Sequence, residues 1–344
     1  MKRNGMICML CMCIVMLAGC SGTNNQQSDR TETNGAGEKE IKQTAEIFAM
    51  NTIMNLTVYG EEASQLLKEA RALIQTYEDR FSVNVETSDV AKLNRAGGQP
   101  VQVSEETYDL IQKSMAISEQ TGGIFDISIY PLVRAWGFTE EEYRIPSEEE
   151  RQQIAGIVDY RKIKLAEDHT VIMPEKMQID LGGIAKGYVS DKLMELFRDQ
   201  GAEAAVVSLG GNVQTYGEKP DGTPFTVGIT NPDDGESMLG TIEVGQTAVI
   251  TSGSYQRYFE RDGVRYHHIM DKKTGAPAES DLTSVTVLCE HGEMADSIAT
   301  AMFVMGKDRA IAFDREHHDI SCILIDKSGG IWTSEGIQLK LIKS

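Results

Sequence analysis

The stretch Ile179–Leu193 reads IDLGGIAKGYVSDKL, and its pattern predicts a strand, a glycine turn and the first turns of a helix. An apolar residue followed by Asp180 is typical of a strand that carries a carboxylate to its C-terminal edge. Gly182 and Gly183 then allow a backbone to approach a ligand closely, because they have no side chains. From Tyr188 onward apolar residues recur at helical spacing, so an amphipathic helix begins here.

A glycine turn that leads into a helix presents free N–H groups and the positive end of the helix dipole, and this combination suits a phosphate group. Lys186 adds a positive charge to the turn. The spacings G-x-x-x-x-G-K-[ST] and G-x-G-x-x-G are both absent, so the stretch is neither a Walker P-loop nor a dinucleotide fingerprint. Taken alone, such a junction is more often a tight structural turn than a phosphate site.

The first 20 residues predict an exported lipoprotein. Lys2 and Arg3 precede the apolar segment Met6–Ala18, which is too short to span a bilayer. Leu17–Cys20 resembles the lipobox of bacterial lipoproteins, in which cleavage leaves the cysteine as the lipidated N-terminus. We therefore expect a signal peptide over residues 1–19, followed over residues 20–44 by lipidated Cys20 and a polar, flexible tether. An ordinary signal peptide with an incidental cysteine is the alternative.

The chain is strongly acidic, with 33 Lys and Arg against 52 Asp and Glu and a formal net charge of −19. Nucleic acid and anionic lipid are poor partners for such a negative field, so we expect no nucleic-acid binding. A phosphate ligand would require a divalent cation, or a local cluster of Lys and Arg, to offset the repulsion.

Residues 45–344 predict one folded domain, since no internal repeat and no clear linker follow residue 44. The predicted helices are Glu61–Phe81, a short piece from Ser88, Glu105–Thr121, residues 139–160, the segment after Gly183, and Glu293–Met305. The predicted strands include Ile47–Gly60, two within Lys162–Asp180, Ala204–Gly211, Phe225–Thr230, Gly240–Val244, Thr247–Gly253, Ser284–Cys289 and a closing hairpin of Ser321–Asp326 with Ile331–Thr333.

Two cysteines remain in the predicted domain, Cys289 and Cys322, each inside an apolar run typical of a strand. They could form a disulfide in an oxidising compartment, but the pattern favours two buried free thiols. No cysteine cluster with zinc-binding spacing remains.

Three clusters carry polar groups that a core does not need. The first is Asp180 with Lys186, the second is Tyr266–Gly275 (YHHIMDKKTG), and the third is Asp296 with Thr300. A spacing of four places the carboxylate and the hydroxyl of the third cluster on one helical face, which suits a hard cation with oxygen ligands.

Each cluster also has a structural interpretation. Asp296 and Thr300 could be a capping or solvent-facing pair, and His268 could be a structural histidine with satisfied hydrogen bonds. Joint metal binding by His267 and His268 is disfavoured, because adjacent residues of a strand point to opposite faces.

Taken together, the ordered motifs resemble the ApbE family, the FAD:protein FMN transferases, from Phe48 to near Gly306. The motifs are F-x-M-x-T at Phe48–Thr52, F-S with a later L-N at Phe81–Asn94, G-G-x-F-D at Gly122–Asp126, P-L-V and W-G-F at Pro131–Phe138, D-L-G-G-I-A-K-G-Y at Asp180–Tyr188, S-L-G-G-N at Ser208–Asn212, H-I-x-D-x-x-T-G at His268–Gly275 and A-D-x-x-A-T-A at Ala295–Ala301.

The resemblance implies an α+β fold, an ApbE-like (T-fold-like) domain with a mixed, largely antiparallel β core flanked by helices. It also implies a Mg²⁺-dependent transfer of the FMN moiety of FAD to a threonine hydroxyl of a target protein, through a phosphoester bond and with release of AMP. The implied metal ligands are the side chains of Asp296 and Thr300 and the carbonyl of Gly183.

The resemblance further assigns the remaining site residues. His268 would help to deprotonate the acceptor threonine, and Asp271 would orient or balance it. The residues expected to line the FAD site are Met50, Ile124, Phe125, Asp126, Asp180, Lys186 and Met270. The expected acceptors are extracytoplasmic flavoproteins such as subunits of ion-pumping NADH or ferredoxin oxidoreductases, which the enzyme would meet while anchored to the membrane by its lipid.

One position departs from the family pattern. Asn84 stands where the family often has an aromatic residue beside the flavin, and some relatives mainly hydrolyse FAD to FMN and AMP. A Mg²⁺-dependent FAD pyrophosphatase is therefore the first alternative to the transferase. A non-catalytic flavin-binding or solute-binding lipoprotein is the second.

Overall fold

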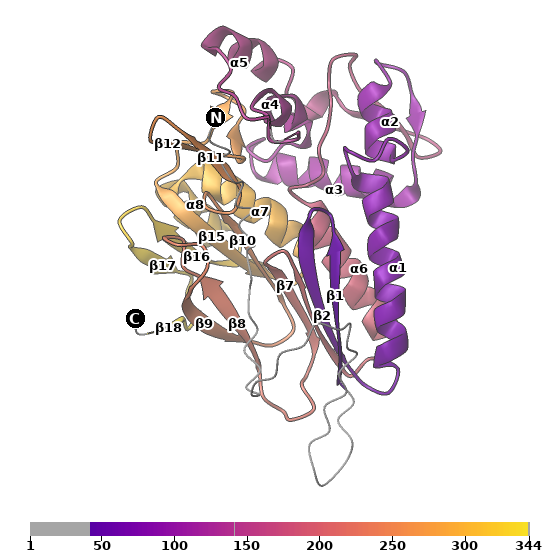
Figure 1. Ribbon diagram of the computed structural model, residues 1–344, viewed down its shortest axis with the longest axis vertical. Helices are drawn as coiled ribbons and strands as arrows, with labels where there is room; N and C mark the ends of the chain where they lie inside the picture. Colours follow the sequence, from indigo (N-terminus) through magenta and orange to yellow (C-terminus); the bar gives the residue numbers. More distant parts are fainter. Residues whose placement is uncertain (1–41, 141, 343–344) are drawn as a thin grey trace, which may run out of the picture.

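The computed structural model describes residues 42–140 and 142–342. The expected signal peptide, the lipidation at Cys20 and most of the expected tether lie outside the described residues. The central element of the fold is an eight-stranded sheet (Figure 1). Its strand order is β1-β2-β6-β7-β10-β15-β16-β17, and every neighbouring pair is antiparallel. The strands are β1 (Lys42–Ala49), β2 (Thr52–Tyr59), β6 (Ala204–Leu209), β7 (Asn212–Gly217), β10 (Ala248–Gly253), β15 (Leu282–Cys289), β16 (Ser321–Asp326) and β17 (Ile331–Thr333).

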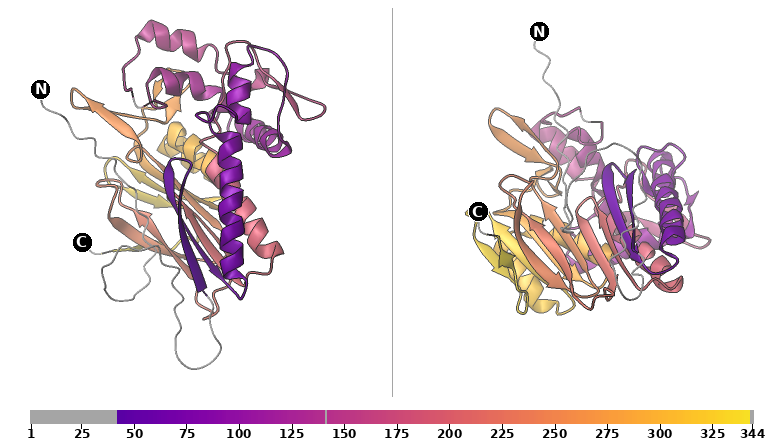
Figure 2. Two further views of the ribbon diagram at one scale, coloured as in Figure 1. Left: turned by 45° about the vertical axis from the view of Figure 1, so that its right-hand side comes forward. Right: turned by 60° about the horizontal axis from the view of Figure 1, so that its bottom comes forward.

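Helices cover one face of this sheet because each presents an apolar stripe to it. The covering helices are α1 (Ala63–Phe81), α6 (Ala185–Asp199), α7 (Gly292–Met305) and α8 (Lys307–Glu316). Figure 2 shows α1 running along the β1–β2 edge. The main core lies between the two layers, where Leu56 and Ile250 of the sheet are buried in one cluster with Phe197 and Met302 of the helices.

Two smaller cores complete the fold. A three-stranded sheet of β8 (Phe225–Thr230), β9 (Met238–Val244) and β18 (Lys340–Leu341) buries Phe225 and Ile242 with Val213 of the large sheet. A third cluster contains Trp136, Phe259 and Met270, and it joins α4 (Tyr130–Ala135) to the hairpin of β11 (Tyr258–Arg261) and β12 (Val264–His267).

The remaining elements are short except for α3, and Figure 1 shows α2 and α5 at the same end of the molecule as α4. They are α2 (Asp89–Arg95), α3 (Glu105–Gln120), α5 (Glu148–Ala155), the 3₁₀ turns Ile127–Ile129 and Tyr160–Lys162, and strands β3 (Val101–Gln102), β4 (Lys164–Ala166), β5 (Thr170–Ile172), β13 (Met270–Asp271) and β14 (Ala276–Pro277). No helix in the described ranges is long and apolar enough to cross a bilayer.

The α+β fold with a largely antiparallel core flanked by helices is confirmed. The single strand expected over Ile47–Gly60 is wrong, because the chain makes a hairpin that begins at Lys42 and turns at Met50 and Asn51. Both turn residues have positive φ (49° and 59°), as a two-residue hairpin turn requires. Met50-Asn51 contains no glycine or proline, so the turn interrupts the strand pattern without an obvious signal. Strand β1 therefore includes residues 42–44, which precede the expected domain boundary at 45.

The strand expected to carry Asp180 is also absent, since residues 177–181 form a loop. The side chain of Asn94 replaces a neighbouring strand: its Oδ1 accepts from the Ile179 N–H at 2.7 Å and its Nδ2 donates to the Ile179 carbonyl at 2.9 Å. An asparagine side chain offers the same donor and acceptor pair as a peptide unit. These two hydrogen bonds therefore fix the loop at Ile179 although it belongs to no sheet.

Candidate functional site

The N-terminus of α6 lies at the centre of the candidate site. Its first turn forms without a side-chain cap from its own N-cap residue, Ile184. The Asp180 carboxylate instead accepts the Gly182 N–H at 2.8 Å, and the Asp180 N–H donates to the Ile127 carbonyl at 2.8 Å. Burial raises the pKa of Asp180, while the Gly182 N–H and the charges of Arg257 and Lys186 act in the opposite direction.

Helix α7 crosses α6 at two glycines. A Cβ added to Gly187 would lie 2.1 Å from the Gly292 carbonyl oxygen, so only glycine permits this approach. The close crossing brings Asp296 of α7, which is 4% exposed, to the start of α6. Its Oδ2 accepts the Gly187 N–H at 3.1 Å and lies 3.7 Å from Lys186 Nζ. The carboxylate therefore caps an N–H group that has no partner within its own helix.

The two helices cap each other. Asp191 of α6 accepts the N–H groups of Gly292 and Glu293, at 2.7 and 2.9 Å, at the start of α7. Gln214 Nε2 of β7 donates to the same carboxylate at 2.8 Å. Because each helix holds the other at its N-terminus, the register of α6 against α7 is closely specified.

Three oxygen atoms at this crossing could accept a cation. Thr300 follows Asp296 by one helical turn, and its Oγ1 lies 3.1 Å from Ser252 Oγ and 3.2 Å from the Asp296 carbonyl. Neither Asp296 Oδ1 nor the Gly183 carbonyl accepts a hydrogen bond from any residue that the structure describes. The described ranges contain no group of three or more His, Cys, Asp and Glu suited to a metal. A cation here would therefore depend on one carboxylate together with hydroxyl and carbonyl oxygens.

His268, just after β12, is tied to the backbone of Arg257. Both its N–H and its Nδ1 lie 3.1 Å from the Arg257 carbonyl oxygen. A carbonyl can only accept, so Nδ1 carries the proton and Nε2 holds the free lone pair. Burial and the charge of Arg257 lower the pKa of His268 to about 3, and Lys186 contributes in the same direction. The imidazole is therefore neutral at neutral pH and lies within the electrostatic reach of the α6 turn.

The neighbouring His267 has a different environment. Its Nε2 lies 3.1 Å from the Ala278 carbonyl oxygen, and its ring packs edge-on against Phe303 at a centroid distance of 5.3 Å. Burial lowers the pKa of His267 to about 4. The two histidines contact different elements, as the strand geometry predicted.

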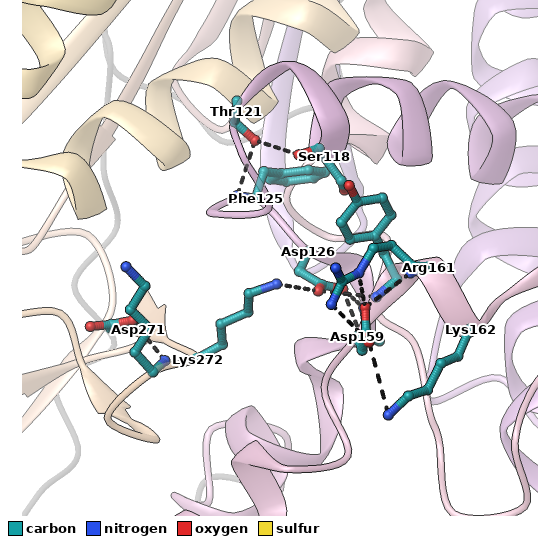
Figure 3. A network of polar contacts seen from close by, with 12 residues as sticks. Ser118, Thr121, Phe125, Asp126, Asp159, Arg161, Lys162, Asp271 and Lys272 are labelled. Atoms are coloured by element: carbon teal, nitrogen blue, oxygen red, sulfur yellow. Dashed lines mark hydrogen bonds and ion pairs between the residues drawn. The ribbon is translucent and has the colours of Figure 1, made fainter.

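The loop with Ile124–Asp126 adjoins the glycine turn. A Cβ on Gly183 would lie 3.2 Å from the ring of Phe125, so this glycine lets the buried ring pack against the turn. The buried Asp126 carboxylate accepts from Ser128 N and Oγ at 3.0 and 2.6 Å, and Lys272 Nζ donates to it at 2.8 Å (Figure 3). Asp126 is thus occupied by protein donors, and its expected place in the lining of the FAD site stays a prediction.

The other expected site residues are more dispersed. Asp271 accepts the Lys273 N–H at 2.9 Å and closes its own turn, and no hydrogen bond joins it to His268 in the described ranges. Its orienting role therefore stays a prediction. Met270 is buried in the third core, and Met50 lies in the β1–β2 turn, where its N–H donates to Glu78 Oε1 at 2.9 Å. Asn84 is exposed just after α1.

Sequence reasoning missed four residues that shape this region: Asp191, Ser252, Arg257 and Lys272. Asp191 lies inside the quoted glycine stretch, and Lys272 lies inside the turn after His268, so their positions were available as signals. Their partners were not, since those contacts depend on how the helices cross. Cys289 and Cys322 are free and buried, which agrees with the favoured interpretation of the sequence. Burial also raises the pKa of Cys289 to about 12.

Comparisons with known proteins agree with this geometry. Residues 50–324 match the sequence profile of the ApbE family. An FAD:protein FMN transferase from Klebsiella pneumoniae (strain 342) is 33% identical over 295 residues, covering 85% of this chain and 91% of the relative. One from Treponema pallidum (strain Nichols) is 33% identical over 311 residues, covering 84% of this chain and 86% of the relative.

Solved structures give the same result. The crystal structure of an ApbE protein from Thermotoga maritima superimposes with a TM-score of 0.81 at 34% identity, covering 86% of this chain and 97% of that chain. The flavin transferase ApbE from Vibrio cholerae superimposes with a TM-score of 0.78 at 29% identity, covering 86% of this chain and 98% of that chain.

Proposed function

The chain belongs to the ApbE family, and we propose on that premise that it transfers the FMN moiety of FAD to a threonine hydroxyl of an acceptor protein, with Mg²⁺ as cofactor and AMP as the second product. The proposal rests on one observation: groups that could bind a pyrophosphate and its cation lie in the same region as a histidine that could act as a base. A helix N-terminus with Lys186 and the oxygen atoms of Asp296 lies within electrostatic reach of the unprotonated Nε2 of His268. The helix N-terminus and Lys186 suit a pyrophosphate, the Asp296 oxygen atoms suit a cation, and Nε2 suits a hydroxyl proton.

In the proposed reaction, one bond to phosphorus forms and one breaks. The threonine Oγ attacks the phosphorus atom on the FMN side of the pyrophosphate, and the bond from that phosphorus to the bridging oxygen breaks. The hydroxyl proton passes to Nε2 of His268, and AMP leaves with the bridging oxygen. A neutral imidazole is a suitable acceptor because a threonine hydroxyl is a weak nucleophile without a base.

Local positive charge is needed because the chain as a whole carries −19. Lys186 and the positive end of the α6 dipole supply part of it. When bound, Mg²⁺ would neutralise further charge on the pyrophosphate. Asp296 Oδ1, Thr300 Oγ1 and the Gly183 carbonyl fit this ion, since hard oxygen atoms are its preferred ligands.

The positive groups also affect the pKa of His268. Arg257 and Lys186 lower its pKa, so a bound anion that offsets their charges raises the basicity of Nε2. We infer that bound FAD offsets the effects of these two charges on the pKa of His268, whereas the larger effect of burial remains. The N-terminal sequence further supports the proposal that the enzyme works outside the cytoplasm, anchored by a lipid on Cys20, on extracytoplasmic flavoproteins.

The function is tested by incubating the purified protein with FAD, Mg²⁺ and a threonine-bearing acceptor peptide. Mass spectrometry should show a peptide that has gained an FMN phosphoester, and chromatography should show AMP. A chelator should suppress both products. Free FMN and AMP with two different unmodified peptides would replace the proposal with a pyrophosphatase, and intact FAD throughout would replace it with a binding protein.

His268→Ala should separate binding from chemistry. We expect FAD affinity to change by less than about twofold while the transfer rate falls by ~10²–10⁴, the usual contribution of a general base. FAD titration and single-turnover transfer at saturating FAD measure the two quantities. His318→Ala, at an exposed histidine of the same domain, is the matched control. A transfer rate equal to that of the unmodified enzyme would remove His268 from the mechanism.

A further inference from the structure

An ion pair between Lys272 and Asp126 joins two segments of the candidate site. Lys272 Nζ lies 2.8 Å from Asp126 Oδ2, with the side chain of Asp126 0% exposed and that of Lys272 22% exposed. The residues are 146 positions apart in the sequence. Figure 3 shows the lysine extended toward Asp126, while the carboxylate of its neighbour Asp271 points the other way. The contact therefore links the turn after His268 directly to the loop beside the glycine turn.

The ammonium group of Lys272 lies beside Gly123 and Tyr160. A Cβ on Gly123 would lie 3.2 Å from Lys272 Nζ, so this glycine leaves room for the ammonium group. The Tyr160 ring lies beside it, 5.7 Å from Nζ to the ring centroid. The Tyr160 N–H donates to Asp126 Oδ2 at 3.2 Å, and Asp159 caps the 3₁₀ turn that holds Tyr160.

Asp126 needs this cation. Its Oδ1 is satisfied by Ser128, and its Oδ2 receives the Tyr160 N–H and the Lys272 ammonium. Without the ammonium, a carboxylate with no solvent exposure would keep only neutral donors, and an uncompensated buried charge is strongly unfavourable. Loss of the lysine is therefore relieved most easily if the loop around Asp126 moves toward water.

Movement of the loop around Asp126 toward water would separate the segments expected to line the FAD site. Phe125 packs against Gly183, and the Ile127 carbonyl accepts the Asp180 N–H, so the loop around Asp126 supports the start of α6. On the other side, Met270 and His268 lie two and four residues before Lys272 in the sequence. The ion pair thus joins two segments whose residues are expected to line the FAD site, the loop of Ile124–Asp126 and the turn after His268.

We propose that Lys272 is a positioning residue whose ion pair with Asp126 fixes the width of the FAD site, so that it determines FAD affinity and leaves the chemical step largely unchanged. The proposal rests on the proposed function of the same site. It concerns a lysine that contacts neither the reacting atoms nor the oxygen atoms expected to hold the metal.

Lys272→Met, which keeps most of the length of the side chain and removes its charge, tests the proposal. We expect the Kd and KM for FAD to rise about tenfold, on the order of one lost charge-assisted hydrogen bond, with kcat within about twofold. Lys272→Arg should restore FAD affinity to within about twofold because it keeps the charge. Lys273→Met removes the same charge one residue later, at an exposed side chain that forms no ion pair in the described ranges, and should change neither quantity.

FAD affinity is measured by titrating flavin fluorescence in the absence of acceptor, and kcat by transfer at saturating FAD. Thermal unfolding of each variant checks the fold, and Lys272→Gln serves if the Met variant unfolds. Unchanged FAD affinity, a proportional loss in kcat, or an equal effect of Lys273→Met would overturn the positioning role. If the wild-type enzyme binds no FAD, both proposals fail. If it binds FAD without transfer, only the proposed function fails and the affinity comparison still decides the role of Lys272.

Discussion

Replacing Asp296 by alanine is expected to reduce FMN transfer about a thousandfold or more while the domain still folds. The substitution removes the one carboxylate expected to hold the cation, and charge stabilisation by a bound metal ion contributes several kcal/mol to such a reaction. It also removes the acceptor for the Gly187 N–H. Loss of a helix cap costs about 0.5–2 kcal/mol, which is less than the total stability of a typical domain.

Asp296→Asn separates the two roles of the carboxylate. An amide oxygen can still accept the Gly187 N–H, whereas the negative charge that attracts a cation is gone. We expect the Asn variant to unfold close to the wild-type temperature yet to be nearly as inactive as the Ala variant. Calorimetric titration with Mg²⁺ and the transfer assay, run side by side, measure this difference. Full Mg²⁺-dependent activity of Asp296→Ala would end the metal assignment.

The helices of this fold were more predictable than its loops. Helices α1, α3, α6 and α7 begin and end within two residues of the expected bounds where bounds were given, because their apolar residues recur at helical spacing. Helix α8 was not expected, since its ten residues bury only Ala310 and Phe313 and the signal is correspondingly weak. The loop through Ile179 resembled a strand because an apolar residue precedes Asp180, but its backbone is bonded to the side chain of Asn94, a partner 85 residues away, instead of to another strand.

The site was predictable where it lies within one segment. Asp296 and Thr300 share a helical face by spacing alone, and the motifs of the resemblance supplied their role. Contacts between residues of distant segments could not be predicted from sequence spacing. Asp191 could be seen as one more polar residue on a surface helix, and only the crossing of α6 and α7 turns it into the cap of another helix. The pairing of Lys272 with Asp126 likewise depends on two loops that meet only in the folded chain.

Gly187→Ala is expected to destabilise the domain by about 3 kcal/mol and to impair metal binding with it. Helix propensity alone predicts the opposite sign, since alanine is better than glycine by roughly 1 kcal/mol in a helix interior. The new Cβ, however, would lie 2.1 Å from the Gly292 carbonyl oxygen and 2.7 Å from the Glu293 nitrogen. These are backbone atoms of α7 and cannot rotate away, so the helices must separate.

Separation acts on both caps at once, because the two helices hold each other through Asp296 and Asp191. We therefore expect urea unfolding to show the loss of stability and calorimetry to show weaker Mg²⁺ binding in the same variant. Gly245→Ala is the matched control, since a Cβ there meets no atom within 4 Å and its φ is not positive. A Gly187→Ala variant with wild-type stability would mean that the crossing tolerates a wider spacing. In that case the position of Asp296 would have to be set by the strands beneath α7 instead of by its contact with α6.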